Sequence, residues 1–145
     1  MQVRHAEVSE VPAVVELYRG YDRQSDIDVA LLELQRHFEE LNRSGYVAVA
    51  VVDRTIVGTY SMYFCSNLAR GGRPFAVVEN VIVAAADRRQ GIGRALMAHA
   101  KQSAREKNCY KLMLATGADR LENIKFYEAC GFSGNKVGFQ VRFGA

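Results

Sequence analysis

The chain alternates between short apolar runs and amphipathic stretches, which predicts strands and helices in a definite order. The stretch from Ser9, a favoured helix N-cap, to Tyr21 predicts a first helix, and Pro12 is tolerated because it falls in the first turn. A second predicted helix begins near Asp28, carries leucines and a phenylalanine at helical spacing, and ends at the polar, glycine-containing residues 42–45.

Residues 46–52 and 56–64 are rich in β-branched and aromatic side chains, and three polar residues separate them. Two such runs predict an antiparallel hairpin. Residues 66–74 contain the glycines, proline and polar side chains of an exposed loop, and a further strand is predicted at residues 75–83.

The strand at residues 75–83 is apolar on both sides. Strict alternation places Val77, Val81 and Val83 on one face and Val78 and Ile82 on the other. A strand with two apolar faces must be covered on both, so we expect it to be central in the sheet.

Helical and strand patterns also follow one another in the second half of the chain. Apolar residues recur at helical spacing from Ile92 to Lys107, and residues 110–116 form the returning strand of a crossover, which predicts parallel pairing with residues 75–83. A short helix at 121–129 is closed by Gly131. Residues 136–143 predict a last strand, with four apolar side chains directed inward: Val137, Phe139, Val141 and Phe143.

These elements predict one α/β domain over residues 1–145, with a mixed, largely antiparallel sheet that contains one parallel pair and has helices on both faces. No apolar run reaches the roughly 20 residues of a membrane span, and the first residues lack the apolar segment of a secretory signal, so we expect a cytoplasmic protein that does not engage a membrane. Three widely spaced cysteines offer neither a disulfide framework nor a metal pair, and no metal site is expected. The net charge of +3 is too small to favour a nucleic-acid partner.

The residues between the predicted central strand and the helix at 92–107 have the composition of an anion-binding turn. Unpaired N–H groups and the helix dipole attract anions at a helix N-terminus, and Gly91 and Gly93 remove side chains that would keep a phosphate away. Arg88, Arg89 and Arg94 add guanidinium groups that suit phosphate oxygens. The alternative interpretation is structural: the glycines only permit a tight turn, and the arginines are solvated. The chain has neither the third glycine of a dinucleotide fingerprint nor a Walker loop.

Two segments resemble the GCN5-related N-acetyltransferases (GNAT). Arg88-Arg89-Gln90-Gly91-Ile92-Gly93 is similar to that family's acyl-CoA motif, Arg/Gln-x-x-Gly-x-Gly/Ala, and it stands between the predicted central strand and a helix. Residues 122–132 (ENIKFYEACGF) look like the family's later Asn, Phe-Tyr and Gly-Phe segment, with one residue fewer between Asn123 and Phe126.

The resemblance implies an acyl-CoA N-acyltransferase fold, in which the central parallel strands splay apart and acetyl-CoA is the cosubstrate. Its pantetheine arm would pair with backbone near Ile82 and Val83, and its pyrophosphate would meet the amides before the helix. The implied cofactor contacts are Ile82, Val83, Arg88, Arg89, Gln90, Gly91, Ile92, Gly93, Arg94, Asn123 and Tyr127.

The resemblance further implies direct attack of a neutral primary amine on the thioester. Tyr127 is the candidate acid for the departing thiolate, and ordinary packing is its alternative role. Glu79 is the candidate base, since a carboxylate on an apolar strand must be paired or useful, and a buried salt bridge is its alternative. We expect Glu79 to contact the acceptor, and Asn80, the weaker candidate, to order either the acceptor or the neighbouring backbone.

Three functions therefore remain open from the sequence. The first is acetyl transfer from acetyl-CoA to the amine of a small molecule or, as an alternative, of a peptide or protein. The second is a non-catalytic acyl-CoA binding module, and the third is a basic domain that contacts nucleic acid. Homodimerisation through the C-terminal strands or a sheet edge is compatible with the resemblance but is not read from these residues.

Overall fold

The computed structural model describes residues 1–21 and 29–144, and the chain forms two compact units, Met1–Met113 and Leu114–Ala145. The first unit contains the whole sheet, and the second contains the last helix and the C-terminal segment. No helix within the described residues is both long and apolar enough to cross a membrane.

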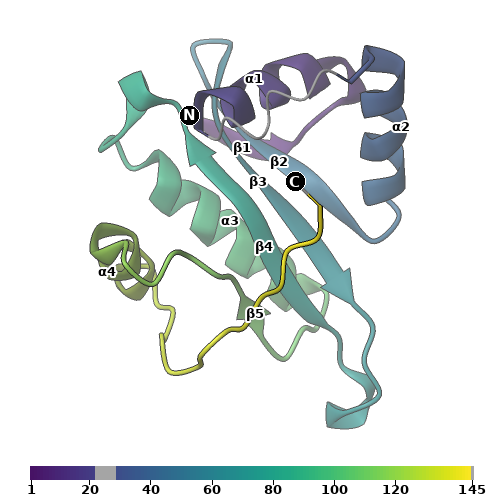
Figure 1. Cartoon of the computed structure of the whole chain (residues 1–145), viewed down its shortest axis with the longest axis vertical. Coiled ribbons are helices and arrows are strands. Elements are labelled where there is room, and N and C mark those ends of the chain that lie inside the picture. The colour runs from purple at the N-terminus through teal and green to yellow at the C-terminus, as the bar shows by residue number, and fades with distance from the viewer. Residues whose placement is uncertain (22–28, 145) are drawn as a thin grey trace. The chain divides into compact units, whose positions relative to one another are not determined.

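The first unit is built on a five-stranded mixed sheet. Its strands follow the order of the chain: β1 (Gln2–His5), β2 (Gly45–Val52), β3 (Thr55–Cys65), β4 (Phe75–Val83) and β5 (Leu112–Met113). Neighbouring strands are antiparallel except for β4 and β5, which are parallel. The expected mixed, largely antiparallel sheet with one parallel pair is therefore confirmed, and Figure 1 shows this arrangement.

Helices cover both faces of this sheet. On one face Val14 of α1 (Val11–Tyr21) packs against Val47 and Val49 of β2, together with side chains of α2 (Leu31–Leu41). On the other face α3 (Ile92–Glu106) lies against β3 and β4 and buries Ile92, Leu96, Met97, Ala100 and Ala104. The described residues of this unit also form three 3-10 turns: η1 (Val8–Glu10), η3 (Arg70–Gly72) and η4 (Ala85–Asp87).

The predicted hairpin is confirmed as β2 and β3, and its turn has a physical signature. Asp53 and Arg54 both have positive φ angles, 48° and 65°, as a tight type I′ connection between twisted strands requires. The helix from Ile92 is also confirmed. It ends at Glu106, and Asn108, two residues later, adopts φ 57°.

The starts of the first two helices differ from the prediction. Ser9 is not an N-cap, because Glu7 and Glu10 form a capping box around η1 and α1 follows directly from Val11. The second helix starts at Leu31, and the predicted start at Asp28 lies outside the described residues. β1 was not expected, since its polar residues hide the strand pattern.

The returning strand is much shorter than residues 110–116. Only Leu112 and Met113 form a ladder, with Ala76 and Val77 of β4. The sequence shows where a strand can form, but the length of the ladder depends on how closely its partner runs beside it.

The strand predicted at residues 136–143 is wrong for the structure as described. That segment forms no ladder, and its four alternating apolar side chains are exposed: Val137 82%, Phe139 95%, Val141 72% and Phe143 89%. Alternation indicates one apolar face, but a strand forms only where a neighbour offers backbone hydrogen bonds, and the pattern carries no information about that neighbour.

A buried polar chain joins the sheet to α3. The hydroxyls of Tyr46 and Tyr60 lie 2.6 Å apart, and the Tyr60 hydroxyl lies 2.6 Å from Nδ1 of His99. His5 stacks on the Tyr46 ring at 3.9 Å between centroids. Burial is the main reason why the pKa of His99 is lowered. His99 is therefore a half-buried side chain that is held against the sheet by its hydrogen bond to Tyr60.

The second unit is organised around α4 (Leu121–Ala129). Gly131, at φ 93°, ends this helix, with the Gly131 N–H donating to the Glu128 carbonyl at 2.9 Å and the Phe132 N–H donating to the Tyr127 carbonyl at 3.0 Å. These two bonds define a Schellman cap, which confirms that Gly131 closes the helix.

Candidate functional site

A β-bulge interrupts β4 at the two residues singled out as acceptor contacts. Ser61 of β3 faces Glu79, whereas Thr59, two residues earlier in β3, faces Ile82, so β4 carries one extra residue between these pairs. Asn80 lies within that interval at φ 55°, a left-handed conformation that asparagine tolerates better than most residues. Asn80 was the one residue in the sequence that could have indicated this bulge, and the sequence analysis did not predict it.

The bulge corrects the expected faces of β4. Side chains two apart along β3 share a face, so their partners Val77, Glu79 and Ile82 also share one, which is the face that α1 and α2 cover. The opposite face, toward α3, then carries Val78, Val81 and Val83. Strict alternation was wrong because the extra residue reverses the pattern after Glu79.

Beyond Val77, β4 runs without a β5 partner in the first unit. The β4–β5 ladder ends at Val77 and Met113, whereas β4 continues to Val83. Ile82 and Val83, the predicted contacts for a pantetheine arm, lie on this continuation. Nε of Arg88 donates to the Val83 carbonyl at 3.4 Å. A backbone edge of this kind can accept an extended ligand as an added strand.

The turn after β4 brings a helix N-terminus to the same end of the strand. Arg89 and Gly91 adopt φ angles of 63° and 81°, and Gly91 is the N-cap of α3 with no side chain capping the first amides. A Cβ on Gly91 would meet no atom within 4 Å, so the space above the turn is open. The Ile92 side chain is buried, so its amide alone is available to a ligand.

Exposed cationic and polar side chains surround this turn. Arg88, Arg89, Gln90 and Arg94 are all exposed, and Gly93 is half-buried in the first turn of α3. The three arginines form no ion pair with any carboxylate of the residues that the structure describes. Uncapped amides, an open glycine and unneutralised guanidinium groups together suit a diphosphate.

Gly58 allows α3 to approach the sheet closely. A Cβ at Gly58 would lie 3.1 Å from Cγ2 of Ile92, 3.2 Å from Cδ1 of Leu96 and 3.3 Å from the Ile82 carbonyl oxygen. Ordinary carbon contacts are about 3.5–4.0 Å. The missing side chain therefore sets the distance between the first turn of α3 and the strands beneath it.

Glu79 lies among hydroxyl groups on the α1 face. Its carboxylate is exposed and forms no ion pair with a described residue, so the alternative of a buried salt bridge is excluded. Burial raises the pKa of the neighbouring Tyr63, the Ser61 hydroxyl opposes this rise, and the Glu79 charge adds to it. Burial likewise raises the pKa of Tyr18 on α1, again opposed by Ser61. Sequence reasoning missed Tyr18, Ser61 and Tyr63, because only strand register brings them beside Glu79.

Asn123 and Tyr127 belong to the second unit. Nδ2 of Asn123 donates to Oγ1 of Thr116 at 3.3 Å, which orients the amide from within that unit. The Tyr127 ring packs edge-on against Phe126 and Phe132, with centroids at 5.1 and 6.0 Å. Ring packing and the Schellman cap therefore fix Tyr127 at the end of α4.

Comparison with known proteins gives a consistent answer. The profile described as the acetyltransferase (GNAT) family matches residues 11–132, which include parts of both units. A glucosamine 6-phosphate N-acetyltransferase from Trypanosoma brucei brucei is 35% identical over 77 residues, which are 53% of this chain and 50% of that protein. The chain thus matches about half the length of that curated relative.

Solved structures extend the likeness to nearly the whole chain. A protein from Agrobacterium tumefaciens assigned as an acetyltransferase is 35% identical with a TM-score of 0.91, covering 99% of this chain and 100% of the other. An acetyltransferase from Trypanosoma brucei is 25% identical with a TM-score of 0.88, covering 98% and 99%. With the profile match over most of its length, the chain belongs to the acetyltransferase (GNAT) family.

Proposed function

We propose that the protein transfers an acetyl group from acetyl-CoA to the primary amine of a small molecule. The observation that carries this proposal is the junction at Gly91, where the uncapped amides of α3 stand at the end of a strand edge that β5 leaves unpaired. Three arginines without an ion pair among the described residues surround that junction. Membership of the GNAT family and the names of its relatives support the same chemistry.

The residues present fit the parts of acetyl-CoA. The amides from Arg89 to Arg94 and the guanidinium groups around them would hold the diphosphate. The backbone at Ile82 and Val83 would pair with the pantetheine amides, with the Arg88 side chain moving from the Val83 carbonyl. Gln90 and Asn123 offer amide groups to the remaining polar atoms of the cofactor.

Glu79 and Asn80 would act on the acceptor side of this strand. An acceptor arrives as an ammonium ion and must lose a proton before its nitrogen can attack, and the exposed Glu79 carboxylate would take that proton directly or through water. Asn80, in the left-handed bulge, would orient the acceptor. A backbone N–H near Val83 would stabilise the negative charge that develops on the thioester oxygen.

Tyr127 is the proposed acid for the leaving thiolate. As amine nitrogen bonds to the acetyl carbon, the carbon–sulfur bond breaks and the sulfur takes the electron pair. The Tyr127 phenol would then give its proton to the sulfur, and the surplus proton on the newly acylated nitrogen would replace it through solvent. The family profile that spans both units supports the proposal that residues 1–145 act as one domain.

We also propose that the protein works as a cytoplasmic homodimer, without a metal, nucleic-acid or membrane partner. The exposed row of Val137, Phe139, Val141 and Phe143 supports the dimer, because four apolar side chains at alternate positions favour pairing with another strand. Sedimentation of wild type and Phe139→Ser tests this proposal. A dimer that the substitution dissociates supports it, and a wild-type monomer contradicts it.

The catalytic proposal is tested by coenzyme A release from acetyl-CoA across a panel of amines, amino acids and peptides. Release that depends on one class of amine, with the acetylated product seen by mass spectrometry, supports transfer. Tight binding of acetyl-CoA without release for any amine would indicate a binding module instead.

A further inference from the structure

Three side chains from neighbouring strands lie in one row on the face that α1 and α2 cover. In strand register Ser61 of β3 faces Val47 of β2 on one side and Glu79 of β4 on the other. Neighbouring strands are about 4.8 Å apart, so Val47 and Glu79 are separated by roughly 10 Å. The row thus connects the proposed catalytic carboxylate with the space beneath the two helices.

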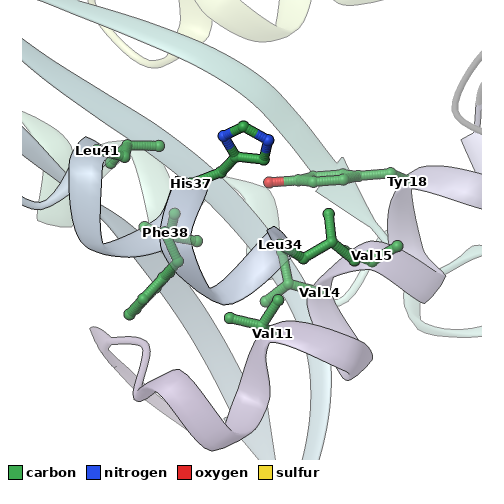
Figure 2. Close-up of a pocket in the computed structure, with 9 residues that line it drawn as sticks. Val11, Val14, Val15, Tyr18, Leu34, His37, Phe38 and Leu41 are labelled. Carbon is green, nitrogen blue, oxygen red and sulfur yellow. The ribbon is translucent and has the colours of Figure 1, made fainter. Parts of the chain in front are cut away.

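A cavity of about 140 Å³ lies at the Val47 end of this row. Figure 2 shows it between α1 and α2, with His37 and Tyr18 on the same side of it. Its walls are almost entirely apolar: Val11, Val14, Val15, Tyr18, Leu34, His37, Phe38, Leu41 and Val47. A cavity of about 150 Å³ with similar walls stays dry and binds benzene in another protein. This one therefore has room for a single ring.

Tyr18 belongs to both the cavity and the row. Tyr18 lines the cavity, and the Ser61 hydroxyl, at the centre of the row, opposes the rise that burial causes in the Tyr18 pKa. Tyr63 lies two residues along β3 on the same face. Burial raises the pKa of Tyr63, and the Glu79 charge adds to this rise. Tyr18 and Ser61 thus join the apolar cavity to the row that ends at Glu79, and Tyr63 lies beside that row.

The Glu79 end of this row carries a negative charge. Glu79 forms no ion pair with a described residue, and the groups that act on Tyr18 and Tyr63 are hydroxyls and the Glu79 carboxylate, with no cation among them. An ammonium ion is attracted to such a surface. A phosphate or carboxylate placed beside Glu79 is repelled by that carboxylate.

We infer, on the basis of the proposed acetyl transfer, that the acceptor is a monocationic amine with a compact apolar body about the size of one ring. Its ammonium group meets Glu79, and its apolar body passes Tyr18 to enter the cavity between α1 and α2. Tyr18 and Tyr63 then determine specificity by contacting the acceptor along this path.

The test compares 2-phenylethylamine, ethylamine and glucosamine 6-phosphate as acceptors, by coenzyme A release from acetyl-CoA. Burial of one ring predicts kcat/KM about 10- to 100-fold higher for 2-phenylethylamine than for ethylamine. Glucosamine 6-phosphate is expected to be the poorest of the three.

A cavity-filling variant separates recognition from folding. Val15→Phe places a ring in the cavity, so kcat/KM for 2-phenylethylamine falls to the ethylamine value, while the ethylamine rate, acetyl-CoA affinity and Tm are kept. Leu34→Phe fills the same space from α2 and serves where Val15→Phe folds poorly. Val8→Phe, at an exposed valine outside the cavity, is the matched control and leaves both amines unchanged.

The outcomes distinguish failure of this inference from failure of the proposed acetyl transfer. If no amine supports coenzyme A release, the proposed function and this inference fail together. Three outcomes leave acetyl transfer standing and overturn this inference alone. They are an equal kcat/KM for ethylamine and 2-phenylethylamine, a highest kcat/KM for glucosamine 6-phosphate, and a preference for 2-phenylethylamine that both cavity-filling variants retain.

Discussion

Gly58→Ala tests whether the close approach of α3 to the sheet creates the cofactor site. The added methyl would lie 3.1–3.3 Å from Ile92, Leu96 and the Ile82 carbonyl oxygen. Relief to ordinary contacts requires the first turn of α3 to move outward by roughly half an ångström. That movement displaces the amides after Gly91 from the end of β4.

The energetic cost can be worked from the same contacts. Overpacking of this kind costs about 1–3 kcal/mol, and replacing a strand glycine by alanine returns about 0.5–1 kcal/mol through backbone entropy. We therefore expect the free energy of unfolding to fall by about 0.5–2 kcal/mol. Displaced amides should weaken acetyl-CoA binding by about tenfold, equivalent to about 1.4 kcal/mol.

Urea unfolding and isothermal titration calorimetry measure the two effects separately. Gly20→Ala is the matched control, because Gly20 lies in α1 with no atom within 4 Å of an added Cβ. That substitution should stabilise the protein by about 0.5–1 kcal/mol and leave affinity unchanged. Wild-type stability and affinity in Gly58→Ala would refute the reasoning, because the glycine would then have no role in placing α3.

Three further substitutions test individual side chains. Glu79→Gln should move the rise of kcat/KM with pH to higher pH, since the free amine must then form in solvent, and an unchanged profile would assign deprotonation to water. Tyr127→Phe should lower kcat by about 10²-fold at unchanged acetyl-CoA affinity, and an unchanged kcat would point to another acid. Burial lowers the pKa of His99 in the folded protein, so neutral His99 favours the folded state. This contribution to stability is complete above about pH 6.5 and is lost as pH falls toward the folded pKa. Urea unfolding at pH 7.5 and 5.0 should show a smaller loss of stability at the lower pH for His99→Gln than for wild type, and an equal loss would contradict this role for His99.

The sequence predicted much of the first unit because its signals are local. The apolar runs of the hairpin and the helical spacing after Ile92 each specify an element without reference to the rest of the chain. The turn at Gly91 could also be interpreted in advance, since a glycine between an apolar strand and an amphipathic helix favours the positive φ that the structure shows there.

The remaining features depend on contacts between distant segments. The bulge at Asn80 reverses the faces of β4, yet it exists only in register with β3. Ser61 and Tyr18 join the site through that register and through the position of α1. The C-terminal segment 136–143 shows the same limit, since its alternation predicted a strand but could not supply a partner.

Binding of coenzyme A to Gly91→Asp and Gly91→Asn measures the central claim most directly. Both side chains tolerate the left-handed N-cap and have open space, so the pair differs chiefly in one negative charge. Two unit charges about 5–6 Å apart repel by about 3 kcal/mol at an effective dielectric constant of about 20, which is roughly 100-fold in affinity. The same aspartate should stabilise the helix N-terminus. The account predicts a Kd at least about 30-fold weaker for Gly91→Asp than for Gly91→Asn, with an equal or higher Tm; equal affinities would contradict a diphosphate site at the start of α3.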